Sequence, residues 1–338
     1  MVEKNHSFSP LRATMIFCLT FKSGKKSKKD FPLTEKTDYL RKKTGKSPAP
    51  GGALPAARQA PIASVLGEVR PQIARHVFVG GNFFMLRVLN RFRHELGVAA
   101  LPQEFESAAL RTVGFLQTET ARLLVDSVAE RGRRLDVAVT LENLSGHKLP
   151  TAYPSRRVWL RLAVRDAGGR VVFESGALEP DGSIRGNDND ADPKRYEPHF
   201  TEIRRADEVQ IYESIMEDAT GAPTTGLLSG VRYAKDNRLL PAGFDKATAP
   251  KEVAVVGGAA ADGDFTGGGD RIRFLVDLGS AAGPFEVEAE LWYQPVSYRW
   301  ADNLRSYDSE ETRRFGRYWS QMRDASAVRL ARASARSR

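Results

Sequence analysis

The sequence predicts an α+β protein in which a helical connector, an antiparallel β-sandwich-like domain and a C-terminal helix follow one another. Apolar residues recur at helical spacing up to about residue 130, and from Leu135 onward they alternate with polar ones. Long loops separate the alternating segments, which favours an antiparallel sandwich over a parallel sheet. The chain has 338 residues, 41% of them apolar and 28% charged, so wholesale disorder and a membrane bundle are excluded.

The first 60 residues differ in composition from the rest. Residues 1–50 hold 12 basic and four acidic residues, which accounts for eight of the nine net positive charges. A Pro/Ala/Gly-rich stretch follows, so we interpret 1–60 as a disordered basic tail and linker. The remainder divides into a helical connector (61–130), a β-sandwich-like domain (131–303) and a C-terminal helix and tail (304–338). Because the body is nearly neutral, no specific nucleic-acid partner is expected.

Export and redox signals are sparse. The apolar stretch 15–21 is short and is followed by lysines, so it makes no convincing signal peptide. No stretch approaches the roughly 20 apolar residues of a transmembrane segment. Cys18 is the single cysteine, which excludes an internal disulfide framework, a cysteine-based zinc site and covalent haem attachment through Cys-x-x-Cys-His.

Two helices are expected in the connector. Asn82 can cap the first, whose apolar stripe is Met85, Leu89, Phe92 and Leu96, and Gly97 offers a position that ends it. Pro102 opens the second, with an apolar side made by Phe105, Ala109, Val113, Leu116 and Leu123.

Alternation predicts the strands that follow. Segment 135–141 is one strand, and 158–164 forms a hairpin with 171–173 across a turn at 166–169. Further strands are expected at 209–212, 253–256, 271–276 and 285–293. A final helix is expected over about 308–333, with Glu310 and Glu311 in its first turn and Arg329, Arg332 and Arg336 near its end, which suits the helix dipole.

Two histidines lie at element boundaries. His147 follows the strand 135–141 in a turn, a placement that exposes an imidazole for metal ligation or acid–base chemistry. His76 precedes the glycine pair Gly80-Gly81, and glycines let another group approach the backbone closely. An ordinary loop role for His147 and a simple helix-entry turn at Gly80-Gly81 are the alternative interpretations.

Acidic loops suggest a cation site. Asp188, Asp190 and Asp192 alternate within 186–192, and alternating oxygens in a tight loop are what calcium requires. The EF-hand pattern is not met, because Pro193 and His199 stand where it needs glycine and glutamate. A solvated acidic turn is the alternative. A weaker second candidate loop contains Asp262, Asp264 and Asp270. Its glycines, 267–269, more simply mark a flexible loop before the strand 271–276.

Signatures of common enzyme classes are missing from the sequence. It has no phosphate-binding loop, no nucleophile elbow, no His-Glu-x-x-His and no dinucleotide fingerprint in a strand–helix context. The sequence therefore predicts a protein that is not an enzyme by itself.

Four segments together resemble the C-terminal part of bacterial multihaem c-type cytochromes. They are 75–85, which contains His76-Val77-Phe78; 146–159, which begins Gly146-His147-Lys148-Leu149-Pro150-Thr151; 236–246; and 291–300. The resemblance spans about 61–333, and its most specific parts are the two histidine segments. In such proteins a haem-bearing region precedes a helical connector and a β-sandwich-like domain.

The resemblance implies roles for particular residues. His76 and His147 would be distal axial ligands of haem c, with Gly146, Pro150 and Thr151 shaping the turn. This chain departs from the family because it has no haem-attachment motif, so the haems would belong to a haem-bearing cytochrome region or subunit. The resemblance also implies a periplasmic location.

Two functions follow from the sequence. The first is a haem-free accessory or truncated portion of a multihaem electron-transfer protein, in which His76 and His147 complete haems held elsewhere. The competing function is a stand-alone calcium-stabilised β-sandwich binding module, whose loops would present Trp159, Tyr196 or Trp300 to a ligand.

Overall fold

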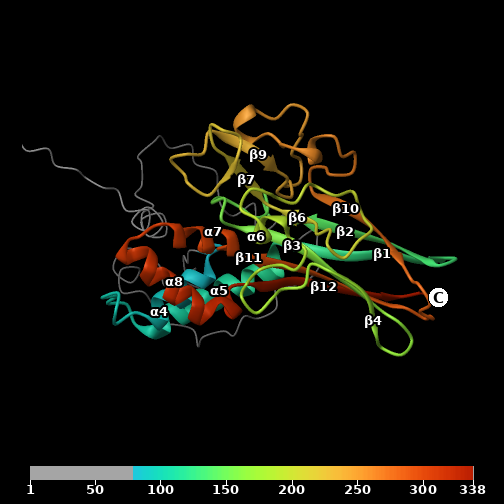
Figure 1. Cartoon of the computed structure of the whole chain (residues 1–338), viewed down its shortest axis with the longest axis horizontal. Helices are drawn as coiled ribbons and strands as arrows, with labels where there is room; N and C mark the ends of the chain where they lie inside the picture. The colour runs from blue at the N-terminus through green and yellow to red at the C-terminus, as the bar shows by residue number, and fades with distance from the viewer. Residues whose placement is uncertain (1–78, 338) are drawn as a thin grey trace, which may run out of the picture. The chain divides into compact units, whose positions relative to one another are not determined.

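A computed structural model of the chain describes residues 79–337 (Figure 1). The basic tail, Cys18 and His76 therefore lie outside the described residues. Within the described part, no helix combines the length and the apolar character needed to cross a membrane.

Two helices open the described part, as the sequence predicts. Helix α4 (Phe83–Arg91) begins after Asn82, whose side chain accepts a hydrogen bond from the backbone N–H of Met85 at 3.0 Å. The helix ends at Arg91, with Phe92 as its C-cap, so the prediction that Gly97 ends it was wrong; Gly97, with a φ of 63°, ends the turns at 92–97 that follow. Helix α5 (Pro102–Glu119) begins at the predicted proline.

Four strands form the first sheet, in the order β1-β2-β10-β5. Their bounds are Ala121–Arg131 (β1), Arg134–Asn143 (β2), Gly269–Asp277 (β10) and Glu202–Ile203 (β5). Strands β2 and β10 confirm two predictions. Strand β1 was not predicted: Leu123, which was placed on the second helix, lies on this strand and pairs with Leu141.

The second sheet has the order β12-β11-β3-β4, and β6 pairs with β3. The bounds are Val328–Arg336 (β12), Glu286–Gln294 (β11), Arg157–Arg165 (β3), Val171–Ser175 (β4) and Ile211–Tyr212 (β6). The β3–β4 hairpin and β11 confirm the sequence prediction. A third, small sheet has the order β8-β7-β9, with bounds Pro223–Thr224, Ser214–Glu217 and Arg232–Asp236.

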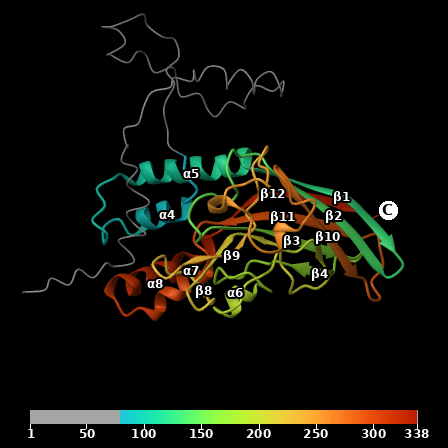
Figure 2. The ribbon, with the colours of Figure 1, turned by 90° about the horizontal axis from the view of Figure 1, so that it is seen from above.

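The two larger sheets enclose the core, which confirms the sandwich-like α+β fold. Phe173 on β4 and Phe274 on β10 meet edge to face across the two sheets, with ring centroids 6.3 Å apart. Alternate residues of β2 and β3, such as Val137 and Leu160, are fully buried. Helices α4, α5, α7 (Tyr298–Asn303) and α8 (Glu310–Met322) gather at one end of the long strands (Figures 1 and 2).

The C-terminal helix is present but shorter than predicted. It ends at Met322, and Arg329 and Arg332 lie on β12, where they pair with Glu290 and Glu288 of β11. The arginines at 329, 332 and 336 are three and four residues apart, a spacing that suits a helix, and a register shift in the β11–β12 pairing brings the first two beside glutamates of β11. The helix-dipole interpretation of these arginines was therefore wrong.

Two smaller strand predictions also fail. Residues 253–256 form no strand: a short 3₁₀ helix, Lys251–Val253, is followed by an isolated bridge between Val256 and Asp236. Of the predicted segment 209–212, only Ile211–Tyr212 is a strand.

Candidate functional site

The turn after β2 holds His147 at the surface. Its backbone carbonyl oxygen accepts hydrogen bonds from Asn143 Nδ2 at 2.7 Å and from Ser145 Oγ at 3.0 Å. The residue is exposed, and its imidazole makes no hydrogen bond or ion pair with any residue from 79 to 337. The backbone is thus fixed while both ring nitrogens stay available.

A second stretch of chain, the segment just after β9, anchors this turn. Leu149 and Leu239 exchange two backbone hydrogen bonds, each 2.9 Å long. Asn143 Nδ2 also donates to the carbonyl oxygen of Leu239 at 3.0 Å. Because Leu239 belongs to the predicted segment 236–246, two of the segments singled out from the sequence lie side by side here.

A buried ion group strengthens the anchor. Asp236, whose side chain is 3% exposed, accepts from Lys148 Nζ at 2.9 Å and from Arg238 Nε and Nη2 at 2.8 and 2.7 Å. Burial acts to raise the pKa of Asp236, but the hydrogen bonds and charge of Arg238, with those of Lys148, outweigh it and hold the pKa below its ordinary value. The carboxylate is therefore ionised at neutral pH and ties the residue after His147 to the protein body.

Arg156 joins the turn to the start of the described chain. Its Nη1 donates to the carbonyl oxygen of Thr151 at 3.2 Å. The same atom would lie 2.7 Å from a Cβ at position 81, so the guanidinium packs against the backbone of Gly81 in space that a side chain would fill. Tyr293 closes the arrangement, since its hydroxyl donates to the carbonyl oxygen of Gly81 at 2.7 Å.

All four segments of the sequence resemblance therefore meet, the first of them through its described part, 79–85. Ser155 links 146–159 to 291–300, because its hydroxyl donates to the carbonyl oxygen of Pro295 at 2.9 Å. We call the face supported by these contacts the His147 surface; residues 146, 147, 151 and 152 are exposed on it, whereas 83–85, 239–240 and 293–297 are buried. His76 lies outside the described residues, so only one of the two predicted histidines is placed.

The predicted calcium ligands have other partners. Asp190 is buried and accepts from Arg157 Nη1 and from the backbone N–H of Ile184, both at 2.8 Å. Asp188 pairs with the Arg195 guanidinium, and Asp192 accepts from the backbone N–H of Lys194. In the described chain these three carboxylates do not gather into a common site. Calcium binding stays a prediction, which a thermal melt with and without a chelator would test.

The three aromatic residues expected to be presented by loops differ in how deeply they are buried. Trp159 is fully buried on β3 and donates its ring N–H to the carbonyl oxygen of Gly176 at 2.9 Å, so its prediction as a presented side chain was wrong. Tyr196 and Trp300 are half-buried, and Trp300 packs against Tyr153 with ring centroids 5.3 Å apart.

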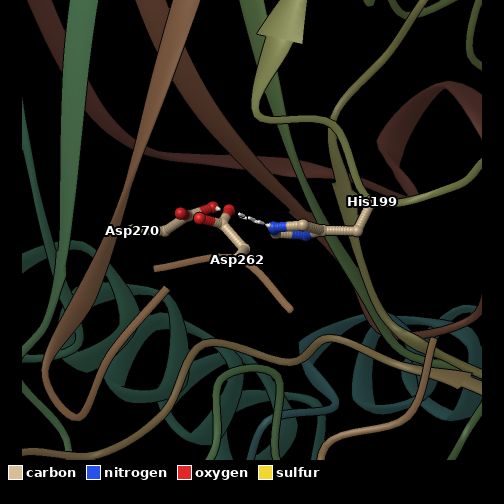
Figure 3. A group of neighbouring side chains, drawn as sticks. All are labelled: His199, Asp262 and Asp270. Atoms are coloured by element: carbon tan, nitrogen blue, oxygen red, sulfur yellow. Dashed lines mark hydrogen bonds and ion pairs between the residues drawn. The ribbon is translucent and has the colours of Figure 1, made fainter. Parts of the chain in front are cut away.

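A second polar group lies inside the protein. Figure 3 shows His199, Asp262 and Asp270; one ring nitrogen of His199 and one carboxylate oxygen of each aspartate lie within 4.8 Å of one another. His199 Nε2 is 2.9 Å from Asp262 Oδ2 and 3.9 Å from Asp270 Oδ2. Their side chains are at most 4% exposed. The sequence placed both aspartates in one candidate loop but gave no signal that His199 would join them.

The neighbouring amides fix the tautomer of His199. Its Nδ1 faces Gln210 Nε2 at 2.9 Å and Asn237 Nδ2 at 3.1 Å. Both amides are oriented by backbone N–H groups, because Phe200 donates to Gln210 Oε1 and Glu213 donates to Asn237 Oδ1. Nδ1 is therefore an acceptor, and the ring proton sits on Nε2 and is donated to Asp262.

This arrangement suits a hydrogen-bond network better than a metal centre. A cation on Nε2 would require the proton to move to Nδ1, opposite two N–H donors. Burial lowers the pKa of His199, so the ring stays neutral. Burial also raises the pKa of Asp270 to about 7, and the charge of Asp262 adds to the effect. We assign the group to the core that holds Asn237, the neighbour of Asp236, in place.

Comparison with known proteins leaves the family open. No family model matches the chain, and no curated protein matches it. Among solved structures it is similar to a penta-heme cytochrome c552 from Thermochromatium tepidum, with a TM-score of 0.38 and 16% sequence identity. The match covers 66% of this chain and 40% of that chain, so the matched part spans less than half of the cytochrome's length. The class defined by the fold is an α+β sandwich protein, and the likeness to a multihaem cytochrome is distant.

Proposed function

We propose that this chain is a haem-free accessory, or a truncated portion, of a multihaem cytochrome-like electron-transfer protein. In this role His147 completes the coordination of a c-type haem that a partner region or subunit holds. The observation that carries the proposal is the His147 surface: hydrogen bonds link the described parts of four segments that resemble multihaem cytochromes, and one of these segments carries an exposed imidazole on an anchored turn. The protein then works outside the cytoplasm, in the periplasm, and is no enzyme by itself.

The residues present fit the outer ligand of a haem and do not fit its attachment. The sequence contains no Cys-x-x-Cys-His, so the chain cannot hold a c-type haem covalently. An imidazole nitrogen is a common axial ligand, and the identity of that ligand helps to set the potential at which a bound haem exchanges electrons. His147 offers such a nitrogen without giving up any hydrogen bond to the described residues.

The supporting residues reduce the cost of binding. Asn143 and Ser145 fix the backbone carbonyl of His147, and the ion group at Asp236 fixes Lys148. A ligand held in its bound conformation beforehand loses less conformational entropy on binding. His76 is proposed as a second ligand by the sequence resemblance alone.

A haem peptide tests the proposal. The probe is a proteolytic fragment of a c-type cytochrome, in which the peptide's own histidine fills one axial position and the other is open. Wild-type protein should convert its absorption spectrum to that of a low-spin, bis-histidine haem, and His147→Ala should abolish the conversion. His94→Ala is the matched control, because His94 is also an exposed histidine of the described chain.

The outcomes separate clearly. Conversion that persists in His147→Ala rejects the ligand role of that residue, and conversion lost in His76→Ala alone assigns the role to His76. If His94→Ala lowers the conversion as much as His147→Ala does, the binding is that of any exposed histidine and the proposal fails.

A further inference from the structure

Arg156 stands out among the basic residues of the His147 surface because it has no acidic partner. Its hydrogen bond goes to a neutral group, the carbonyl oxygen of Thr151, and no carboxylate of residues 79–337 lies within 4.0 Å of it. The next residue, Arg157, is paired with Asp190, and Arg238 is paired with Asp236. Arg156 is half-buried, so its charge is neither fully hydrated nor neutralised by a partner.

The surroundings of Arg156 carry an excess of positive charge. Three cations, Lys148, Arg156 and Arg238, contact the loop or its anchor, and Asp236 is the carboxylate that pairs with two of them. Residues 143–156 contain no aspartate or glutamate. A concentration of one sign of charge beside a fixed loop favours a partner of the opposite sign.

Packing keeps the guanidinium in place. Gly81 lets Arg156 approach its backbone, and the Tyr293 hydroxyl donates a hydrogen bond to the Gly81 carbonyl oxygen. Nη1 donates to Thr151, and the remaining N–H donors of the fork make no hydrogen bond to the described residues. A preorganised planar fork is the geometry that binds carboxylates through two hydrogen bonds.

We infer that Arg156 binds a carboxylate of the docking partner, specifically a propionate of the haem that His147 ligates. The inference rests on the proposed function and adds the group by which the haem is recognised. A c-type haem keeps its two propionates ionised at one edge of the macrocycle. Iron coordination by His147 and a charge-assisted hydrogen bond from Arg156 would then fix both the position and the rotation of the haem.

The test compares the haem peptide with its dimethyl ester, in which both propionate charges are removed. Arg156→Gln should weaken binding of the free-acid peptide about tenfold, the size of one charge-assisted hydrogen bond, and leave binding of the ester unchanged. Arg156→Lys keeps the charge without the fork and should recover part of the affinity for the acid. The readout is the dissociation constant from the low-spin absorption change.

Control variants separate recognition from general effects. Arg122→Gln removes an exposed arginine of β1, and it should change neither dissociation constant. The melting temperature of Arg156→Gln shows whether the variant is folded, and Arg156→Lys supplies the comparison if that temperature falls.

Each failure has its own signature. Equal weakening of acid and ester by Arg156→Gln, or no weakening of either, overturns the carboxylate role while leaving the ligand role of His147 intact. If wild-type protein forms no low-spin complex with either peptide, the proposed function fails and this inference fails with it.

Discussion

The substitution Asp236→Asn tests the anchor of the His147 turn. It removes a buried negative charge and leaves two cations, Lys148 and Arg238, facing a neutral amide. Removing one partner of a buried ion pair costs about 3–5 kcal/mol. The side chains of Lys148 and Arg238 are 10% and 16% exposed and can regain some water, so we expect the lower end, about 3 kcal/mol.

Urea unfolding at pH 7, followed by tryptophan fluorescence, measures this loss of unfolding free energy. Asp207→Asn is the matched control, because Asp207 pairs with Arg205 where both side chains are about two-thirds exposed, and it should leave the midpoint unchanged. A loss below about 1 kcal/mol for Asp236→Asn would refute the argument that this ion group holds the turn.

The pH dependence supplies a second check on the same residue. The folded-state pKa of Asp236 is below its ordinary value of 3.8, so the carboxylate stabilises the fold above that value and ceases to do so as the pH falls through the folded pKa. The stability difference between wild type and Asp236→Asn should therefore be constant near neutrality and shrink below about pH 4. Affinity for the haem peptide should fall in the variant, because Lys148 no longer fixes the residue after His147.

Four further substitutions probe the backbone and the buried network. Ala152 has a φ of 62°, so Ala152→Gly should raise the unfolding free energy by about 0.5 kcal/mol, and a lower urea midpoint would contradict this. Gly176→Ala should cost more than about 2 kcal/mol, because φ is 75° and the new Cβ would meet a backbone oxygen at 2.7 Å. Gly132→Ala, with a φ of 65° and open space, should cost about 1 kcal/mol, and equal losses for the two would be inconsistent with the clash. Burial raises the pKa of Asp270 from 3.8 to about 7, so the folded protein binds this proton more tightly than the unfolded chain does, and wild type should lose stability as the pH rises from 4 to 7. Asp270→Asn removes the titrating group and should abolish this part of the loss. A pH profile of the variant that runs parallel to that of wild type would contradict the prediction.

Much of the fold followed from local patterns. In a strand with one buried face, apolar and polar residues alternate along the sequence. This alternation allowed β2, β10, β11 and the β3–β4 hairpin to be predicted within a few residues. The cap at Asn82 could also be predicted, because its hydrogen bond joins residues only three positions apart. Strand β12 escaped prediction because Arg329 and Arg332 suit a helix end equally well until their partners on β11 are known.

The site divides in a similar way. The sequence by itself determined that His147 follows a strand in a turn and that the 338 residues contain no Cys-x-x-Cys-His motif, and it singled out the four segments of the resemblance. Local sequence also sets the short contacts from Asn143 and Ser145 that fix this turn.

Only the tertiary structure decided which residues share a surface. Gly81, Arg156 and Tyr293 are brought together across 212 positions of sequence, because the order of strands in a sheet depends on burying every apolar face at once and not on any one segment. The same packing gave Arg157 a buried carboxylate and left its neighbour Arg156 without one. Pairing of charges depends on which distant chains meet, so the sequence could name the candidate histidine but not the arginine beside it.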